Sequence, residues 1–324
     1  MKIYPGNESE KPVLREVIDD LKLKNNILGK TIHVADKGLN CTQNIVSSKK
    51  NGDGYLFSKS VKTLSEKEKT WVLLEQDYNE VRNKSGKVLY RYKSCIDQFP
   101  YSVECNGKKH TIMLTEKRLV TYNSCLAAKK RYEINRLVEK AKSLTFSQDK
   151  KSEFGESGKY VNFINENGKK AQVKINQNMI NKDLEFAGYN LLITSEIKMN
   201  DNDIYNIYHN LWRIEESFRV MKSDLDARPV FLQKEDTIKG HFLICYLTVL
   251  LERIFQFKIL NDKNSASEVF KFIKEFQVTK GEYNYINTTK NSIFINELAK
   301  KYHLPLTNYF LSETQIKKIF NCKI

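Results

Sequence analysis

The sequence has few cysteines, and none stands in a pattern that indicates chemistry. Six cysteines occur in 324 residues. No two of them form a Cys-x-x-Cys pair, and none combines with histidine at the spacing of zinc ligands. Zinc-ribbon proteins and disulfide scaffolds are therefore excluded. The pattern indicates reduced thiols in a cytosolic protein.

Long apolar runs are also missing. The longest, residues 242–251, is too short to span a bilayer, and His241, Glu252 and Arg253 flank it. We therefore expect a buried core helix there. Met1 is followed by Lys-Ile-Tyr-Pro-Gly, which lacks the apolar segment of a signal peptide. Together these features predict a cytoplasmic protein without a membrane segment.

Positive charge, by contrast, is abundant. The chain has 54 Lys and Arg against 39 Asp and Glu, a net charge of +15. With 40% hydrophobic and 11% aromatic residues it can still bury a core. Two interpretations of the charge stay open. One is an anionic partner, of which nucleic acid is the commonest. The other is a lysine-rich surface that is simply solvated.

The first sixty residues show the order of elements of an α/β fold. Apolar residues recur at helical spacing over residues 13–21, and a β-branched run follows at residues 31–36. A short helix is expected at residues 42–48 and a strand at residues 55–57. We interpret residues 1–59 as a partial α/β core.

From about residue 60 the pattern becomes strand-like. Val88, Tyr90 and Tyr92 alternate with polar residues, and Asn-Gly pairs at 106–107 and 167–168 predict hairpins. One amphipathic helix interrupts, roughly over residues 124–144. The segments expected after the core are a β-rich insertion at 60–195, a helical region with a following core helix at 196–262, and a C-terminal helical region at 263–324.

Two carboxylates far apart in the sequence are the candidates for chemistry. Asp36 ends the strand-like run 31–36, and Glu215 lies on a helix predicted from Asn200 or Asp201 to Leu225. Such carboxylates suit a divalent-metal site for phosphoryl transfer. Glu215 is expected to share one helix face with Tyr208, Leu211 and Lys222. A neighbouring apolar stripe, expected to dock on the sheet, comprises Ile214, Phe218, Met221 and Leu225.

Each carboxylate also has a plainer interpretation, which stays open at this point. An Asp after a strand often only makes an Asx turn, as Asp36 would. A Glu on a helix, such as Glu215, is usually solvated. Glu216 is a competitor for the site, but it is displaced by about 100° around the helix. We expect Glu216 to point to solvent and prefer Glu215.

The combined motifs resemble a known class of enzymes. Three stretches carry the resemblance: Tyr4-Pro-Gly-Asn-Glu-Ser-Glu, His33-Val-Ala-Asp-Lys-Gly-Leu, and Leu211-Trp-Arg-Ile-Glu-Glu-Ser-Phe-Arg-Val-Met-Lys. In this order they are similar to bacterial insertion-sequence transposases of the DDE class, in the branch with a Tyr-Arg-Glu-Lys signature on its last catalytic helix. The resemblance runs over nearly the whole chain. Leu211 stands where the signature has Arg.

The resemblance implies a ribonuclease-H-like fold with a β-rich insertion, acting on double-stranded DNA at transposon ends and in the target. It assigns catalysis and binding of Mg²⁺ or Mn²⁺ to Asp36 and Glu215. It assigns contacts with DNA near the cleaved end to Tyr208 and Lys222. A homodimer on DNA and a nucleoid-associated location are implied too. Leucine cannot make a charge-assisted bond to phosphate, so Leu211 should weaken binding to DNA ends.

The family's first catalytic Asp should lie upstream of everything in this sequence. We therefore expect an N-terminally truncated copy that lacks the first two strands of the fold. The strand at residues 31–36 would then have an open edge, and the chain alone would not cleave DNA. The alternative, from a different functional class, is a non-catalytic DNA-binding or regulatory fragment of a transposase.

Overall fold

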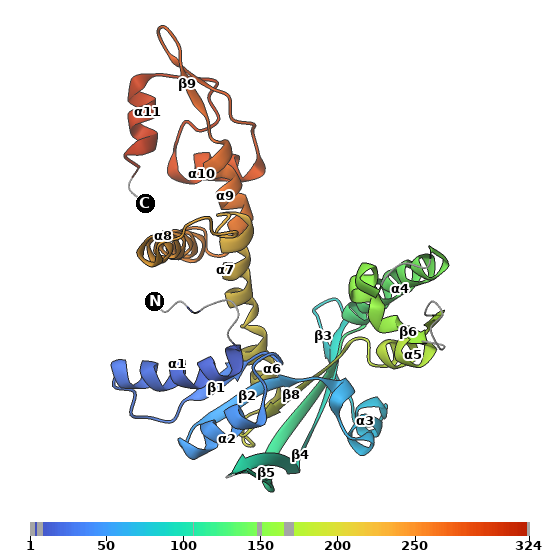
Figure 1. Cartoon of the computed structure of the whole chain (residues 1–324). Coiled ribbons are helices and arrows are strands. Elements are labelled where there is room, and N and C mark those ends of the chain that lie inside the picture. The colour runs from blue at the N-terminus through green and yellow to red at the C-terminus, as the bar shows by residue number, and fades with distance from the viewer. Residues whose placement is uncertain (1–3, 5–8, 106, 148–150, 165–171, 323–324) are drawn as a thin grey trace. The chain divides into compact units, whose positions relative to one another are not determined.

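The chain folds into a mixed α/β protein with two compact units. The computed structural model describes residues 4, 9–105, 107–147, 151–164 and 172–322. The first unit, Asn7–Leu211, is called the sheet unit, and the second, Met1–Gly6 with Trp212–Ile324, is called the helical unit (Figure 1). The predicted α/β class is confirmed. The predicted boundaries after residues 59, 195 and 262 stay a prediction, whereas the division between the compact units falls after Leu211.

The sheet unit is built on a six-stranded sheet with the order β1-β2-β8-β5-β4-β3. β1 and β2 are parallel and every other neighbouring pair is antiparallel. Helix α2 connects β1 to β2, so the predicted strand–helix–strand unit is confirmed. The elements are β1 (Ile32–Ala35), α2 (Thr42–Lys50), β2 (Gly54–Lys59), β3 (Asn79–Arg82), β4 (Val88–Cys105), β5 (Lys108–Tyr122) and β8 (Tyr189–Thr194).

Strands of the segment expected to form an insertion continue this same sheet. β8 pairs with β2 on one side, where Phe57 faces Ile193, and with β5 on the other, where Leu119 faces Leu192. The alternation of side chains along β8 sends Leu191 and Ile193 into one core and Leu192 into the other. The sequence predicts a strand at residues 189–193, and β8 confirms it, but the local pattern does not show which distant strands it pairs with.

Most of the residues that predicted hairpins, Asn106 and the pair Asn167–Gly168, lie outside the described residues. The strands around them do pair: β4 and β5 run antiparallel up to Cys105 and Lys108, and β6 pairs with β7. Segment 60–195 is more helical than expected, since it also contains α3, α5 and two 3₁₀ segments.

The helices of the sheet unit cover its sheet and ends. Figure 1 shows α4, α5 and β6 gathered in one group, and α4 contacts α5. The predicted helix at 124–144 is confirmed as α4. The remaining elements are α1 (Glu10–Lys24), η1 (Val61–Thr63), α3 (Glu66–Leu73), α4 (Ser124–Ser147), η2 (Lys151–Tyr160), β6 (Val161–Ile164), β7 (Gln172–Ile175), α5 (Gln177–Glu185) and α6 (Asp201–His209).

The helical unit has two small apolar cores. Val220, Val249 and Phe270 join α7, α8 and α9 in the first, and Leu260, Phe294 and Leu298 belong to the second. Its elements are α7 (Trp212–Ser223), α8 (Glu235–Ile254), η3 (Phe255–Ile259), α9 (Ala266–Glu275), β9 (Val278–Lys280), β10 (Tyr285–Asn287), α10 (Ile293–Tyr302), β11 (Phe310–Leu311) and α11 (Glu313–Phe320).

Helix α8 is less buried than the sequence predicts. Its buried residues are Cys245, Val249 and Glu252, whereas Ile244 and Leu251 are each 67% exposed. The expectation of a fully buried core helix at residues 242–251 is therefore wrong, because α7 and α9 contact only part of its circumference. Among the residues that the structure describes, no helix is both long and apolar enough to cross a membrane.

The long helix predicted from residue 200 to 225 is two helices. The side chain of Asn200 caps α6, as predicted, by accepting from the backbone N–H groups of Asn202 and Asp203. α6 ends in a tighter turn, in which the N–H of Leu211 donates to the carbonyl of Tyr208. α6 packs on β1 and β2, and α7 packs on α8. Because of the break, α6 belongs to the sheet unit and α7 to the helical unit.

Candidate functional site

Asp36 follows β1 at its C-terminal end, on an edge strand of the described sheet. The open edge was expected, but β1 is not the buried strand predicted, since only Ala35 is buried. A polar cluster holds β1 to its neighbours. Buried Asp53 accepts from Lys22 Nζ at 2.6 Å and from the Thr31 N–H at 2.9 Å. His33 Nε2 lies 3.4 Å from Asp53, and burial lowers the pKa of His33.

The Asp36 carboxylate is exposed and only one of its oxygens is engaged. Oδ1 accepts from the Lys37 N–H at 2.6 Å and from the Tyr208 hydroxyl at 3.2 Å. The structure records no partner for Oδ2 among the described residues. The bond to Lys37 is local, but it joins adjacent residues and is not the bond to the second residue on that defines an Asx turn. The bond to Tyr208 is an additional, long-range contact that a turn does not require.

Tyr208 is positioned by the packing of α6 on the sheet. Ile204, one turn earlier, is fully buried against Leu56, and Tyr208 is half-buried in the same cluster. His209 stacks on Tyr205 with ring centroids 3.7 Å apart. These contacts fix the orientation of α6. The structure thus brings together two of the four predicted site residues, Asp36 and Tyr208.

Glu215 and Lys222 lie on α7 in the helical unit, so they are described apart from Asp36. Both side chains are exposed. The expected face of α7 is rotated, because Glu216 is half-buried and pairs with Arg253 of α8 at 3.0 Å. Glu216 therefore does not point to solvent, and a charge partner on α8 is the reason. Ile214 and Phe218, expected to dock, are 55% and 56% exposed.

Asp36 and Glu215 are the donors that the predicted metal site would use. Carboxylate oxygens are the ligands that Mg²⁺ and Mn²⁺ prefer, and Asp36 Oδ2 and Glu215 are such donors. Within the described part of the chain, however, no group of three or more His, Cys, Asp or Glu side chains lies together in a way that could hold an ion. The donor set inside each unit is therefore short of a complete metal centre.

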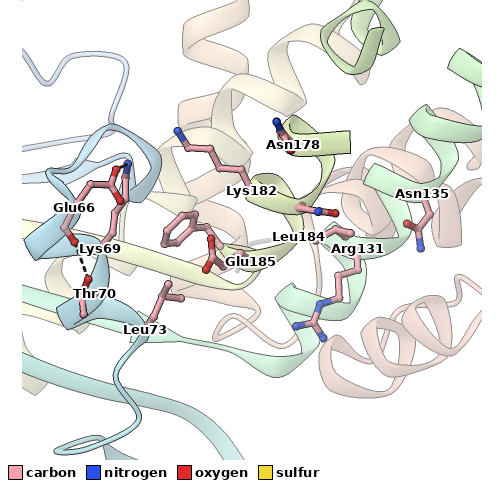
Figure 2. A pocket seen from close by; sticks show the side chains of 12 residues that line it. Glu66, Lys69, Thr70, Leu73, Arg131, Asn135, Asn178, Lys182, Leu184 and Glu185 are labelled. Atoms are coloured by element: carbon pink, nitrogen blue, oxygen red, sulfur yellow. Dashed lines mark hydrogen bonds and ion pairs between the residues drawn. The ribbon is translucent and has the colours of Figure 1, made fainter. Parts of the chain in front are cut away.

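A large cavity of the sheet unit has neither Asp36 nor Tyr208 in its lining. It measures about 1070 Å³ and is bordered by α3, α4 and α5. Figure 2 shows Lys69 and Thr70 on one side, Lys182 and Glu185 on another, and Arg131 across from them. Its charges are close to balance, since Lys69 pairs with Glu66 at 2.7 Å and Glu185 accompanies the remaining cations. This balance argues against a site for a strongly charged ligand.

A second cavity, of about 410 Å³, borders Lys37, the residue that follows Asp36. We call it the lysine cavity. The lysines in its lining are Lys37, Lys59, Lys62, Lys129 and Lys130. No sequence pattern indicates it, because Lys129 and Lys130 fit the solvated face of a helix equally well. The net charge of +15 was the only signal. Comparison with known proteins adds no family: the sequence matches no protein-family model and no curated protein.

Proposed function

We propose that this chain is a DDE-type DNA transposase, with a ribonuclease-H-like core, that acts at insertion-sequence ends. Asp36 and Glu215 are its catalytic residues, and Tyr208 and Lys222 contact DNA. The observation that supports this most is the hydrogen bond from Tyr208 to Asp36, two residues 172 positions apart. The resemblance assigns both residues to one site, and this contact is what such a site requires.

The geometry of the sheet unit agrees with this assignment. A carboxylate at the C-terminal end of a strand with a parallel neighbour is where α/β sheets place their chemistry. Tyr208 holds one oxygen of Asp36 and leaves Oδ2 open toward solvent. Duplex DNA is the expected partner, bound by a homodimer. Mg²⁺ or Mn²⁺, shared by Asp36 and Glu215, stays a prediction from the resemblance.

Duplex binding tests the role of Lys222. The anisotropy of a fluorescein-labelled duplex of mixed sequence gives the Kd at several salt concentrations. Lys222→Gln should reduce the slope of log Kd against log salt by about 1, as expected for one lost phosphate contact. Lys300→Gln is the matched control, since Lys300 is also exposed in the last turn of a helix of the helical unit. Equal effects of both changes would contradict the assignment.

A second function is favoured by the net charge of +15, which suits binding to DNA. A non-catalytic protein that binds DNA and regulates the full enzyme would need no metal centre. In Mg²⁺, this chain alone should leave supercoiled plasmid uncut. Nicking that is lost in Asp36→Asn would show a working active centre. Asp97→Asn is the control, because Asp97 is exposed and accepts from the next N–H at 2.7 Å, as Asp36 does.

A further inference from the structure

The lysine cavity lies wholly within the sheet unit and is formed by segments far apart in sequence. The end of β2 and η1 contribute residues 58–62, and the first turns of α4 contribute Leu126, Lys129, Lys130 and Glu133. Residues 186–190 close it from the side of β8, and Lys37 completes it. At about 410 Å³ its volume is in the range of small-ligand sites.

Lysines outnumber carboxylates in the lining of this cavity, and both carboxylates already pair with lysines. Two carboxylates face the five lysines. Asp183 is paired with Lys62 and lies 3.3 Å from Lys159, and Glu133 lies 3.0 Å from Lys130. For Lys37, Lys59 and Lys129 the structure records no ion pair within the described residues. Three ammonium groups thus border one space without a recorded ion pair, although Glu133 and Glu116 act electrostatically on Lys129 and Lys59.

Lys59 differs from Lys37 and Lys129, which are exposed. Its side chain is half-buried, and burial, together with the nearby Arg118, lowers the pKa of Lys59 to about 8. Glu116 and the ring of Tyr101, 5.6 Å from Lys59 Nζ, lie on its inner side, but they do not offset this effect. A bound anion would supply the charge that the protein lacks here.

The cavity is held in shape by a close backbone approach. Gly188 has a φ of +91°, and a Cβ added there would lie 2.5 Å from the Cβ of Ala127 on α4. The side chain of Asn123 caps α4 by accepting from the Leu126 N–H at 3.0 Å. α4 is thus fixed against the start of β8. This placement brings Lys129 to the cavity and limits the entropy lost on binding.

We propose that the lysine cavity binds a phosphate group, either of a nucleic-acid backbone or of a free polyphosphate. Lysine is a point-charge ligand for phosphate, and Ser60 and Asn190 in the lining add hydrogen-bonding groups. This goes beyond the proposed function, because it needs neither the carboxylates nor a metal. An anionic group there would also lie beside Lys37, the neighbour of Asp36.

The test uses the full chain without divalent metal, in EDTA. Pyrophosphate binding is measured by titration calorimetry, and binding of a labelled duplex by anisotropy. The variant Lys37→Gln with Lys129→Gln should weaken pyrophosphate binding about tenfold or more, because each charge-assisted bond to phosphate contributes at least that factor. Lys140→Gln is the control for loss of a positive charge outside the cavity, because Lys140 is exposed further along α4. Circular dichroism checks that all variants fold.

Each outcome decides the proposal. Weaker binding of both pyrophosphate and duplex in the double variant, with a shallower salt dependence for the duplex, supports a site for backbone phosphate. Weaker binding of pyrophosphate alone supports a site for a free polyphosphate. The proposal is overturned if the wild-type chain binds no pyrophosphate, or if the double variant matches Lys140→Gln with both probes. Because Asp36 and Glu215 are untouched, neither result bears on the catalytic assignment.

Discussion

A buried carboxylate in the sheet unit gives the sharpest stability prediction. Glu116 of β5 is fully buried and accepts from Tyr55 at 2.5 Å and from Tyr101 at 2.7 Å. Arg118, also buried, lies 3.2 Å from its other oxygen and pairs with Glu68 of α3. This network joins β2, β4, β5 and α3. It holds in place the strand that pairs with β1.

Glu116→Ala should cost about 3–5 kcal/mol of unfolding free energy, the range for removing one partner of a buried ion pair. Two tyrosine hydroxyls lose their acceptor, and each buried unsatisfied group costs about 1–3 kcal/mol. If the unpaired hydroxyls cause part of the loss, adding Tyr55→Phe and Tyr101→Phe removes these two groups. The triple variant should then recover about 2 kcal/mol.

Urea unfolding followed by tryptophan fluorescence measures this. The chain has two tryptophans. A Trp212→Phe background leaves Trp71, which packs against the core of the sheet unit. Glu104→Ala, an exposed Glu of the same hairpin, is the control and should change stability by less than about 0.5 kcal/mol. A loss below about 1 kcal/mol in Glu116→Ala, or no recovery in the triple variant, would refute this account.

Three further predictions follow from the same contacts. Gly188→Ala should destabilise the sheet unit by more than about 1 kcal/mol, seen as a lower urea midpoint, because the new Cβ meets Ala127 and the φ is positive; an unchanged midpoint would count against the close approach. Lys59 loses its charge as pH rises through about 8, so calorimetry should find that its contribution to pyrophosphate affinity, the ratio of wild type to Lys59→Gln, falls between pH 7 and 9.5; a constant ratio would exclude Lys59 from the site. Tyr208→Phe should change stability by no more than about 1.5 kcal/mol, since its bond to Asp36 is exposed, yet anisotropy should show weaker duplex binding; full binding would remove Tyr208 from the interface.

The local pattern predicted the helices and strands near Asp36 well. The β-branched run before it, the short helix at residues 42–48 and the strand at 55–57 all form, although β1 is less buried than its pattern predicted. The cap at Asn200 was predictable, since a capping side chain bonds to its own helix. The strand–helix–strand unit that carries Asp36 could thus be derived from the sequence alone.

Contacts with distant segments determine where the charged side chains point, and the local sequence pattern does not show this. Arg253, 37 residues beyond Glu216, turns that carboxylate toward α8. Glu116 sits in a run that looks like a solvated strand, and its three partners come from β2, β4 and β5. The lysine cavity likewise depends on how α4 meets β8. Periodicity reports which side of an element is apolar but not which charged residue will face it.

The central proposal is that Asp36 and Glu215 bind the metal of a DNA-cleaving enzyme, and metal-dependent duplex binding tests it most directly. Duplex affinity is measured by anisotropy at constant ionic strength, with Mg²⁺ and with EDTA. We predict that Mg²⁺ strengthens binding by the wild-type chain, and that Asp36→Asn and Glu215→Gln each abolish this gain. The controls Asp97→Asn and Glu297→Gln, both at exposed positions, should keep it. Affinity that ignores Mg²⁺ in the wild-type chain, or a gain that survives both site changes, would contradict the proposal.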